Sequence, residues 1–326
     1  MLPPLENRLA ASMTSTYRFC ADPSCSPGNS RVLLEREATY RCGDRVERAS
    51  FALRLCTRCH LAFVDPAPPE DMLASFYTSD YAYYAAAGDH PSHEAGSWKY
   101  KLARMRYLDL TQPSATNRAR SLLAVVAELL ARKTITFTLG VPLTMSTSSR
   151  ILDYGYGTGS WLLAMSLLGY SHLAGYDLAS NAHRREELAA NGIQVVPPGG
   201  LSELTAHSLD CVRLEHVFEH LPDPLGVLRM LHRLLRPHGR LLMTFPSIYP
   251  WLRVKDLVGS PFLDYLQVPV HLAHHSLESS SRLLRAAGFE VAASRITRRE
   301  RFITLMARKQ ERPGSSSKDL AGSAAS

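Results

Sequence analysis

Short apolar runs and longer segments with helical spacing alternate along the second half of the chain. The short runs predict strands at 151–153, 172–176, 193–196, 209–214, 240–245, 289–294 and 302–307. The longer segments predict helices at 161–168, 181–191, 225–235 and 277–287. This alternation is typical of an α/β fold with a mostly parallel sheet and helices on both faces. The last two strands are joined by a tight turn, so they must be antiparallel to each other.

The first half of the chain has a different pattern. Several short β-like runs, of which 50–55 is the clearest, lie close to the cysteines, and prolines then interrupt the chain. Helical spacing returns at 97–110 and 117–133. We therefore expect five parts: a flexible terminus at 1–16, a small cysteine-bearing domain at 17–69, a helical connector or lid at 70–147, the α/β domain at 148–310 and a disordered tail at 311–326.

Composition is that of an ordinary globular protein. The chain has 326 residues, 45% hydrophobic and 21% charged, which allows about two domains at roughly 150 residues each. The net charge of +7 permits anionic partners without requiring them. No apolar stretch is long enough for a membrane span, and the first residues lack the pattern of a signal peptide. We expect a soluble, cytoplasmic protein without a membrane partner.

Five of the six cysteines lie in the first 59 residues. In a chain without a signal peptide, this clustering favours metal binding over disulfides. Two close pairs can enclose a tetrahedral structural Zn²⁺ ion, and they are Cys20, Cys25, Cys56 and Cys59. Cys42 and Cys211 are then left over, and His60 directly follows a ligand and would be cramped as a replacement. The alternative is a set of reduced structural cysteines without a metal.

A glycine-rich loop follows the strand that ends at Asp153 and reads Gly155-Tyr-Gly-Thr-Gly159. Glycines at this strand–helix turn of a Rossmann-like sheet let the backbone approach a ligand closely. Asp177 ends the next strand, where a carboxylate can bind both ribose hydroxyls of a nucleotide. Ser160 stands where a dinucleotide motif has Gly or Ala, and the Asp153 carboxylate beside the loop suits an ammonium-bearing ligand better than a pyrophosphate. The alternative is a tight turn that binds nothing.

Residues 151–159 resemble the first motif of class I S-adenosylmethionine-dependent methyltransferases. The segment 209–224 resembles the fourth-strand motif of this superfamily, 234–246 resembles the following turn and fifth strand, and the similarity covers roughly 148–308. The resemblance implies that S-adenosyl-L-methionine binds at Asp153, Gly155, Tyr156, Gly157, Gly159, Asp177, Leu178 and Glu215. An acidic residue that often contacts the adenine is missing from 195–201.

The resemblance also implies that the end of the fourth strand faces the methyl group. His216 is the first candidate for a catalytic base there, because imidazole titrates near neutral pH, and Glu215 precedes it. His271 is a further candidate that could reach the same site. We expect Glu219 and His220 to orient the loop. A metal held by Glu215, His216, His220 and His271 is a possibility that their spacing does not require.

Cys56 and Cys59 have the spacing of a zinc-ribbon knuckle, so we expect a small zinc-ribbon-like domain at 17–69. Together with Pro66, Phe76, Tyr77 and Tyr81, this segment resembles that of methyltransferases with an N-terminal zinc-binding segment, including tailoring enzymes. We therefore expect methylation of carbon or oxygen in a small molecule, such as a sugar or natural-product intermediate. The first alternative is an RNA or protein methyltransferase that uses the zinc segment for recruitment; nucleic acid is not expected, because the arginines there alternate with acids. The second is a non-catalytic adaptor, which would not need an intact glycine loop. Oligomeric state is not indicated.

Overall fold

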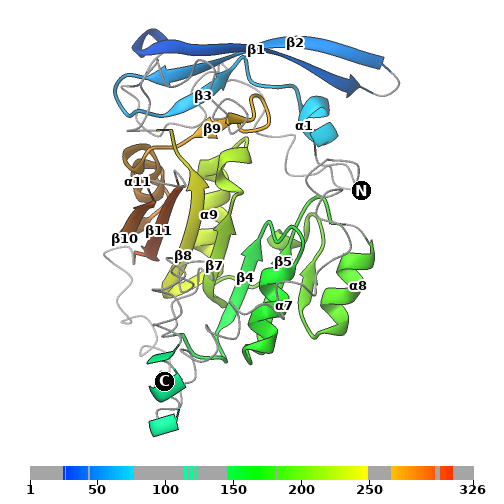
Figure 1. The fold of residues 1–326 in the computed structure, drawn as a ribbon, viewed down its shortest axis with the longest axis vertical. Helices are drawn as coiled ribbons and strands as arrows, with labels where there is room; N and C mark the ends of the chain where they lie inside the picture. Colours follow the sequence, from blue (N-terminus) through cyan, green and yellow to red (C-terminus); the bar gives the residue numbers. More distant parts are fainter. Residues whose placement is uncertain are drawn as a thin grey trace, which may run out of the picture.

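The computed structural model describes residues 25, 27–42, 45–76, 114–116, 118–120, 122–123, 145–180, 182–248, 266–297 and 302–310. Most of the predicted connector, both predicted flexible ends, Cys20, and the tyrosines at 77 and 81 lie outside these residues. The described residues form two sheets, with the smaller one above the larger one in the view of Figure 1. None of the helices described is long and apolar enough to cross a membrane.

The larger sheet has seven strands in the order β10-β11-β8-β7-β4-β5-β6. Its strands are β4 (Arg150–Tyr154), β5 (His172–Tyr176), β6 (Gln194–Val196), β7 (Leu209–Glu215), β8 (Leu235–Pro246), β10 (Phe289–Thr297) and β11 (Phe302–Lys309). The pairs from β8 to β6 are parallel, whereas β11 is antiparallel to both of its neighbours. The predicted fold class is therefore confirmed.

Four helices cover the two faces of this sheet, and two 3-10 turns, η3 (Gly200–Ser202) and η4 (Phe218–His220), lie in its loops. The helices are α7 (Ser160–Leu167), α8 (Ala182–Ala190), α9 (Pro224–Leu234) and α11 (Leu277–Ala286). Buried leucines of α9 and α11 pack in one core cluster, and buried side chains of α7 and α8 pack in another. The apolar positions that predicted these helices are thus the ones that bury them against the sheet.

Strand β8 is longer than the sequence predicts. The predicted strand covers 240–245, but β8 also includes residues 235–239, because Leu209 of β7 pairs with Leu235 and Cys211 then pairs with Arg240. The residues of β8 between these two pairs outnumber those of β7, so β8 forms a bulge there, in which His238 has a φ of +60°. The apolar pattern misses this segment because its side chains do not alternate between the two faces.

The smaller sheet has the order β1-β2-β3-β9 and is antiparallel throughout. It is preceded by a short turn, η2 (Pro27–Asn29), and consists of β1 (Ser30–Cys42), β2 (Arg45–Cys56), β3 (Ala62–Asp65) and β9 (Ala273–His274), with α1 (Glu70–Phe76) beside it. Where the sequence indicates several short runs, the structure has one long hairpin, β1–β2. Leu53, Phe51 and Met72 are among the residues of its own core cluster.

Strand β9 joins the two sheets, although it comes from the sequence of the predicted α/β domain. Ala273 and His274 pair with Phe63 and Ala62 of β3, and the Val64 N–H donates to the carbonyl oxygen of Leu272 at 2.9 Å. The segment 271–276 is therefore held from one side by the smaller sheet. The domain boundaries near 69 and 148 remain predictions.

Candidate functional site

The glycine loop turns sharply between β4 and α7. Gly155, Gly157 and Gly159 have φ values of +82°, +52° and +71°, which favour glycine over any residue with a Cβ atom. A Cβ atom on Gly155 would clash with the side chain of Val217, whereas one on Gly157 would meet no atom within 4 Å. The loop is therefore packed on its Val217 side and open at Gly157, where a ligand can approach the backbone.

Asp177 lies beside this loop at the end of β5. Its Oδ2 accepts a hydrogen bond from Gly157 N–H at 2.7 Å, and its Oδ1 accepts one from Ala179 N–H at 2.8 Å. Burial raises the pKa of the Asp177 carboxyl, and these two backbone hydrogen bonds partly offset the shift. Each carboxylate oxygen keeps a lone pair, so the side chain retains capacity to accept bonds from two ribose hydroxyls.

These residues fit the adenosyl part of S-adenosylmethionine. Gly157 leaves open space, Asp177 offers its carboxylate, and the Leu178 side chain is 63% exposed and can pack against an apolar ring. Tyr156, which we expected at the cofactor, is buried in the core cluster below the loop and hydrogen-bonded to Ser180. Its contribution to a ligand is thereby limited to its backbone.

Asp153 is part of a buried chain of charges. It is fully buried, and its Oδ1 accepts a hydrogen bond from Arg213 Nη1 at 2.8 Å. Arg213 also forms an ion pair with Glu215, and its guanidinium lies 4.4 Å from the centre of the Trp161 ring. Burial raises the pKa of the Asp153 carboxyl, and Arg213 partly offsets this. The carboxylate that we expected at an ammonium group is thus engaged by an arginine.

Sequence reasoning did not identify Arg213. The available signal was a single basic residue in the middle of the apolar run 211–214, on a strand that the fold must bury. Buried arginines are almost always paired. The identity of the partner, Asp153, depends on the parallel pairing of β4 with β7.

His216 follows β7 directly, with a φ of +53°. Its side chain is 42% exposed, its Nδ1 lies 3.5 Å from Oε1 of Glu219, and its ring packs edge-on against Phe302 with centroids 4.7 Å apart. The next residue, Val217, is the one packed against Gly155. An exposed imidazole backed by a buried carboxylate therefore lies next to the glycine loop.

His271 lies close to Glu219 and is buried. The Leu272 N–H donates to the backbone oxygen of Glu219 at 2.9 Å, and the rings of His271 and His220 are 4.7 Å apart. Burial lowers the pKa of His271, and the neighbouring histidines His274, His220 and His216 lower it further. His271 is thus neutral near pH 7. The structure brings it close to the predicted base, but under the surface.

The cysteines Cys25, Cys56 and Cys59 lie together and are buried, with their sulfur atoms within 4.8 Å of one another. The sulfur atoms of Cys25 and Cys56 are 3.6 Å apart, far beyond the roughly 2.05 Å of a disulfide bond. Two thiolates on a tetrahedral Zn²⁺ ion, with Zn–S bonds of about 2.3 Å, are separated by roughly 3.8 Å. The three cysteines therefore fit a zinc site, whose fourth predicted ligand lies outside the described residues. Cys211 is buried in β7.

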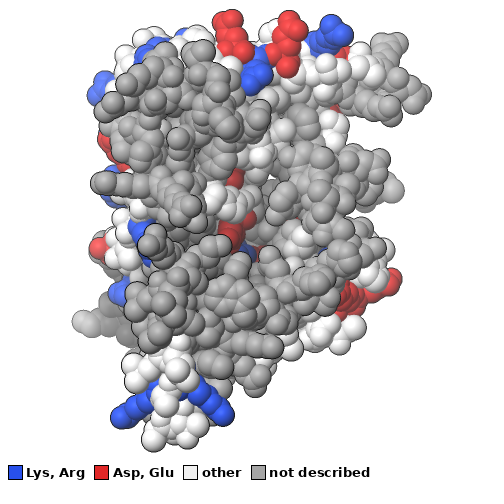
Figure 2. Space-filling model, viewed as in Figure 1, with Lys and Arg blue, Asp and Glu red and all other residues white. Residues whose placement is uncertain are grey.

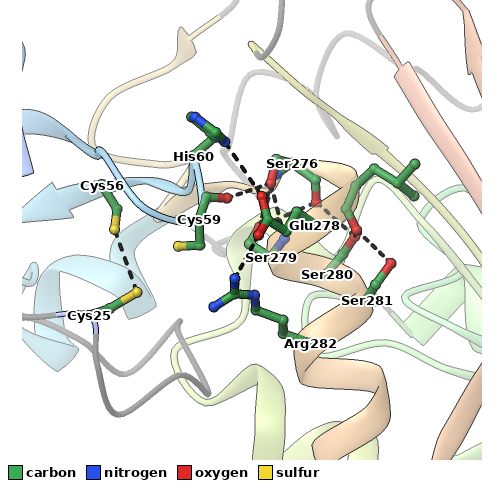
Figure 3. Close-up of polar contacts among 11 residues, drawn as sticks. Cys25, Cys56, Cys59, His60, Ser276, Glu278, Ser279, Ser280, Ser281 and Arg282 are labelled. Carbon is green, nitrogen blue, oxygen red and sulfur yellow. Dashed lines mark hydrogen bonds and ion pairs between the residues drawn. The ribbon is translucent and has the colours of Figure 1, made fainter.

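The cysteine cluster sits at the start of α11, as Figure 3 shows. Ser276 caps this helix, and its hydroxyl also donates to the backbone oxygen of Cys59 at 2.7 Å. His60 turns toward α11, with its Nδ1 3.6 Å from Glu278 Oε2, and this carboxylate also accepts a hydrogen bond from Arg282. His60 thus faces the helix, and the cluster is connected to the segment that carries His271.

Comparisons with curated proteins find relatives of partial length. The ubiquinone biosynthesis O-methyltransferase of Neisseria meningitidis serogroup A is 27% identical over 161 residues, which cover 44% of this chain and 64% of the relative. The protein of the same name from Aeromonas salmonicida is 28% identical over 120 residues, 35% of this chain and 50% of the relative. The chain thus spans between half and two thirds of the length of these relatives.

Solved structures and a family model complete the comparison. An S-adenosylmethionine dependent methyltransferase from Mesorhizobium loti has a TM-score of 0.42 and 21% identity, and covers 56% of this chain and 98% of its own. The Burkholderia thailandensis 1,6-didemethyltoxoflavin-N1-methyltransferase, solved with 1,6-didemethyltoxoflavin and S-adenosylhomocysteine, has a TM-score of 0.45 and 16% identity, and covers 84% and 99%. A family model described as a methyltransferase domain matches residues 115–294, more than half of the 326 residues. The chain therefore belongs to the methyltransferase domain family.

Proposed function

We propose that this protein transfers the methyl group of S-adenosylmethionine to an oxygen or carbon atom of a small molecule, such as a sugar or natural-product intermediate. The observation that carries the proposal is the exposed His216 imidazole, 3.5 Å from the buried Glu219 and adjacent to the residue that packs on Gly155. A base placed beside the cofactor loop suits an acceptor that must lose a proton. The relatives named as ubiquinone biosynthesis O-methyltransferases support a hydroxyl acceptor.

The bound cofactor supplies a methyl group that its positively charged sulfur has already activated. Asp177 holds the ribose, and the glycine loop brings the backbone close to the adenosyl part. His216 accepts the proton of the acceptor, and the Glu219 carboxylate lies behind it, with Oε1 3.5 Å from Nδ1 of the imidazole. Fixing the acceptor in line with the methyl group contributes several kcal/mol through proximity.

A structural Zn²⁺ ion bound by Cys20, Cys25, Cys56 and Cys59 is the second part of the proposal. The separation of the described sulfur atoms and their burial support it. Four thiolates leave no open coordination position, so this ion stabilises the fold and takes no part in the reaction.

The charges of the β1–β2 hairpin also bear on the choice of acceptor. Figure 2 shows acidic and basic side chains interspersed on this hairpin, at the top of the view, without a basic run. Binding of nucleic acid depends on clustered Lys and Arg residues. The hairpin therefore supports a small-molecule acceptor over a recruited RNA.

Replacing Asp177 by alanine is expected to weaken the binding of S-adenosylhomocysteine by at least about 10- to 100-fold, because even one hydrogen bond to a carboxylate contributes roughly 1.5–3 kcal/mol. Titration calorimetry measures the change. Asp210→Ala is the control, since Asp210 lies at the start of β7 and binds Arg150 and Arg236 instead. Absence of binding to the wild type would refute the use of this cofactor.

Replacing His216 by alanine is expected to lower the turnover number by about 100-fold or more and to leave the affinity for S-adenosylhomocysteine unchanged. The assay follows transfer of a labelled methyl group to a panel of hydroxylated small molecules. His172→Ala, an exposed histidine at the opposite end of the sheet, is expected to retain wild-type turnover. Equal turnover in His216→Ala and the wild type would exclude His216 as the base.

A further inference from the structure

The side chain of Glu219 is buried without hydrogen-bond partners. It is 1% exposed, and among the described residues neither Oε1 nor Oε2 accepts a hydrogen bond. Nδ1 of His216 lies 3.5 Å from Glu219 Oε1, on a ring that is 42% exposed. Burial of a carboxylate without compensation costs several kcal/mol, so such groups are generally paired or coordinate a metal.

Two imidazoles lie next to this carboxylate. Glu219, His220 and His271 each offer one ligand atom, and these atoms lie within 4.8 Å of one another. His271 Nδ1 is buried and has no hydrogen-bond partner among the described residues. Two imidazoles and one carboxylate are a common ligand set for divalent transition ions.

Contacts between the segments 219–220 and 270–272, which are distant in the chain, hold these three side chains in place. Nδ1 of His220 donates a hydrogen bond to the backbone oxygen of Val270 at 3.0 Å, and Leu272 N–H donates to the backbone oxygen of Glu219 at 2.9 Å. A second ring nitrogen bound to a carbonyl is the usual way in which a metal-binding histidine is oriented. These hydrogen bonds hold Glu219 and His220 against the segment that carries His271.

We propose that Glu219, His220 and His271 bind a divalent transition-metal ion, at a site separate from the cysteine cluster. Three protein ligands leave at least one coordination position for an oxygen atom of the acceptor. A hydroxyl group bound to a metal ion loses its proton more readily. The ion would therefore favour methyl transfer to a hydroxyl oxygen over transfer to an amine nitrogen or a carbon atom. This selection rests on the proposed methyl transfer, whereas binding of the ion does not.

The test measures metal content without cofactor or acceptor. Full-length protein is stripped with a chelator, reloaded with Co²⁺ and dialysed, and bound cobalt is measured by mass spectrometry. The wild type is expected to hold about two ions per chain and Glu219→Gln about one. Glu203→Gln, an exposed glutamate elsewhere, is the matched control and is expected to hold as many ions as the wild type. Absorption separates the sites, because only the cysteine site has a thiolate-to-cobalt band.

Cobalt bound only with thiolate absorption in the wild type would overturn the proposal, as would equal cobalt content in Glu219→Gln and the wild type. Circular dichroism verifies folding, and if Glu219→Gln does not fold, His271→Asn decides by the same criterion. Binding of S-adenosylhomocysteine is measured on the same samples. A wild type that binds this ligand, but binds cobalt only with thiolate absorption, refutes the metal site and leaves the proposed function intact.

Discussion

Cys56→Ser is expected to lose the zinc ion and to unfold the smaller sheet. A structural zinc site contributes on the order of 10 kcal/mol, and this site lies where β2 ends and where β3 and α11 meet. Zinc content should fall from about one ion per chain at the cysteines to almost none. Mass spectrometry of dialysed protein gives the metal content, and far-ultraviolet circular dichroism gives the loss of strand structure.

Cys211→Ser is the matched control for this substitution. Cys211 is also fully buried, but burial in β7 raises the pKa of its thiol to about 12, so it remains protonated and does not bind metal. This variant is expected to keep its zinc, although it loses some packing energy. A wild type that is fully folded without zinc would contradict the assignment of the cysteine site.

Arg213→Met is expected to lower the free energy of unfolding by about 3–5 kcal/mol, because it leaves the fully buried Asp153 carboxylate without its charged partner. Urea denaturation followed by circular dichroism measures the effect. Addition of Asp153→Asn to this variant removes the unpaired charge and should recover part of the loss.

Arg236→Met is the comparison that separates a buried pair from an exposed one. The Arg236–Asp210 pair has the same 2.8 Å separation as the Arg213–Asp153 pair. Both side chains of the Arg236–Asp210 pair, however, are in contact with solvent. Its replacement is expected to change the free energy of unfolding by about 0–1 kcal/mol. Equal effects of the two substitutions would show that burial of the Asp153–Arg213 pair does not determine its contribution.

Elements with a strong local pattern were predicted closely. The strand predicted at 172–176 is β5 (His172–Tyr176), and the helix predicted at 277–287 is α11 (Leu277–Ala286). Prediction was poorer for β8, where a bulge breaks the alternation of side chains, and for the hairpin β1–β2, which was expected as several short runs. In both, pairing with a neighbouring strand extends the strand beyond its own apolar pattern.

Residues near one another in the chain also determined the recognisable part of the site. The glycine loop and the acid at the end of the next strand are set by strand–turn–helix geometry, and His216 is placed by the end of its own strand. We expected Glu219 and His220 to orient the loop, and the structure joins them to His271, which was expected as a separate candidate. Their spacing of about 50 residues gives no hint of this contact.

The sequence by itself therefore determined the α/β fold class, the methyltransferase family and the sharp glycine loop, because their patterns are read from neighbouring residues. The two cysteine pairs stay a prediction, since Cys20 lies outside the described residues. Tertiary structure alone decided that Arg213 pairs with Asp153 and that β9 joins the smaller sheet. It also brought His271 close to Glu219 and His220. These contacts join residues 50 or more positions apart, so they follow from strand order and register, which no local pattern specifies.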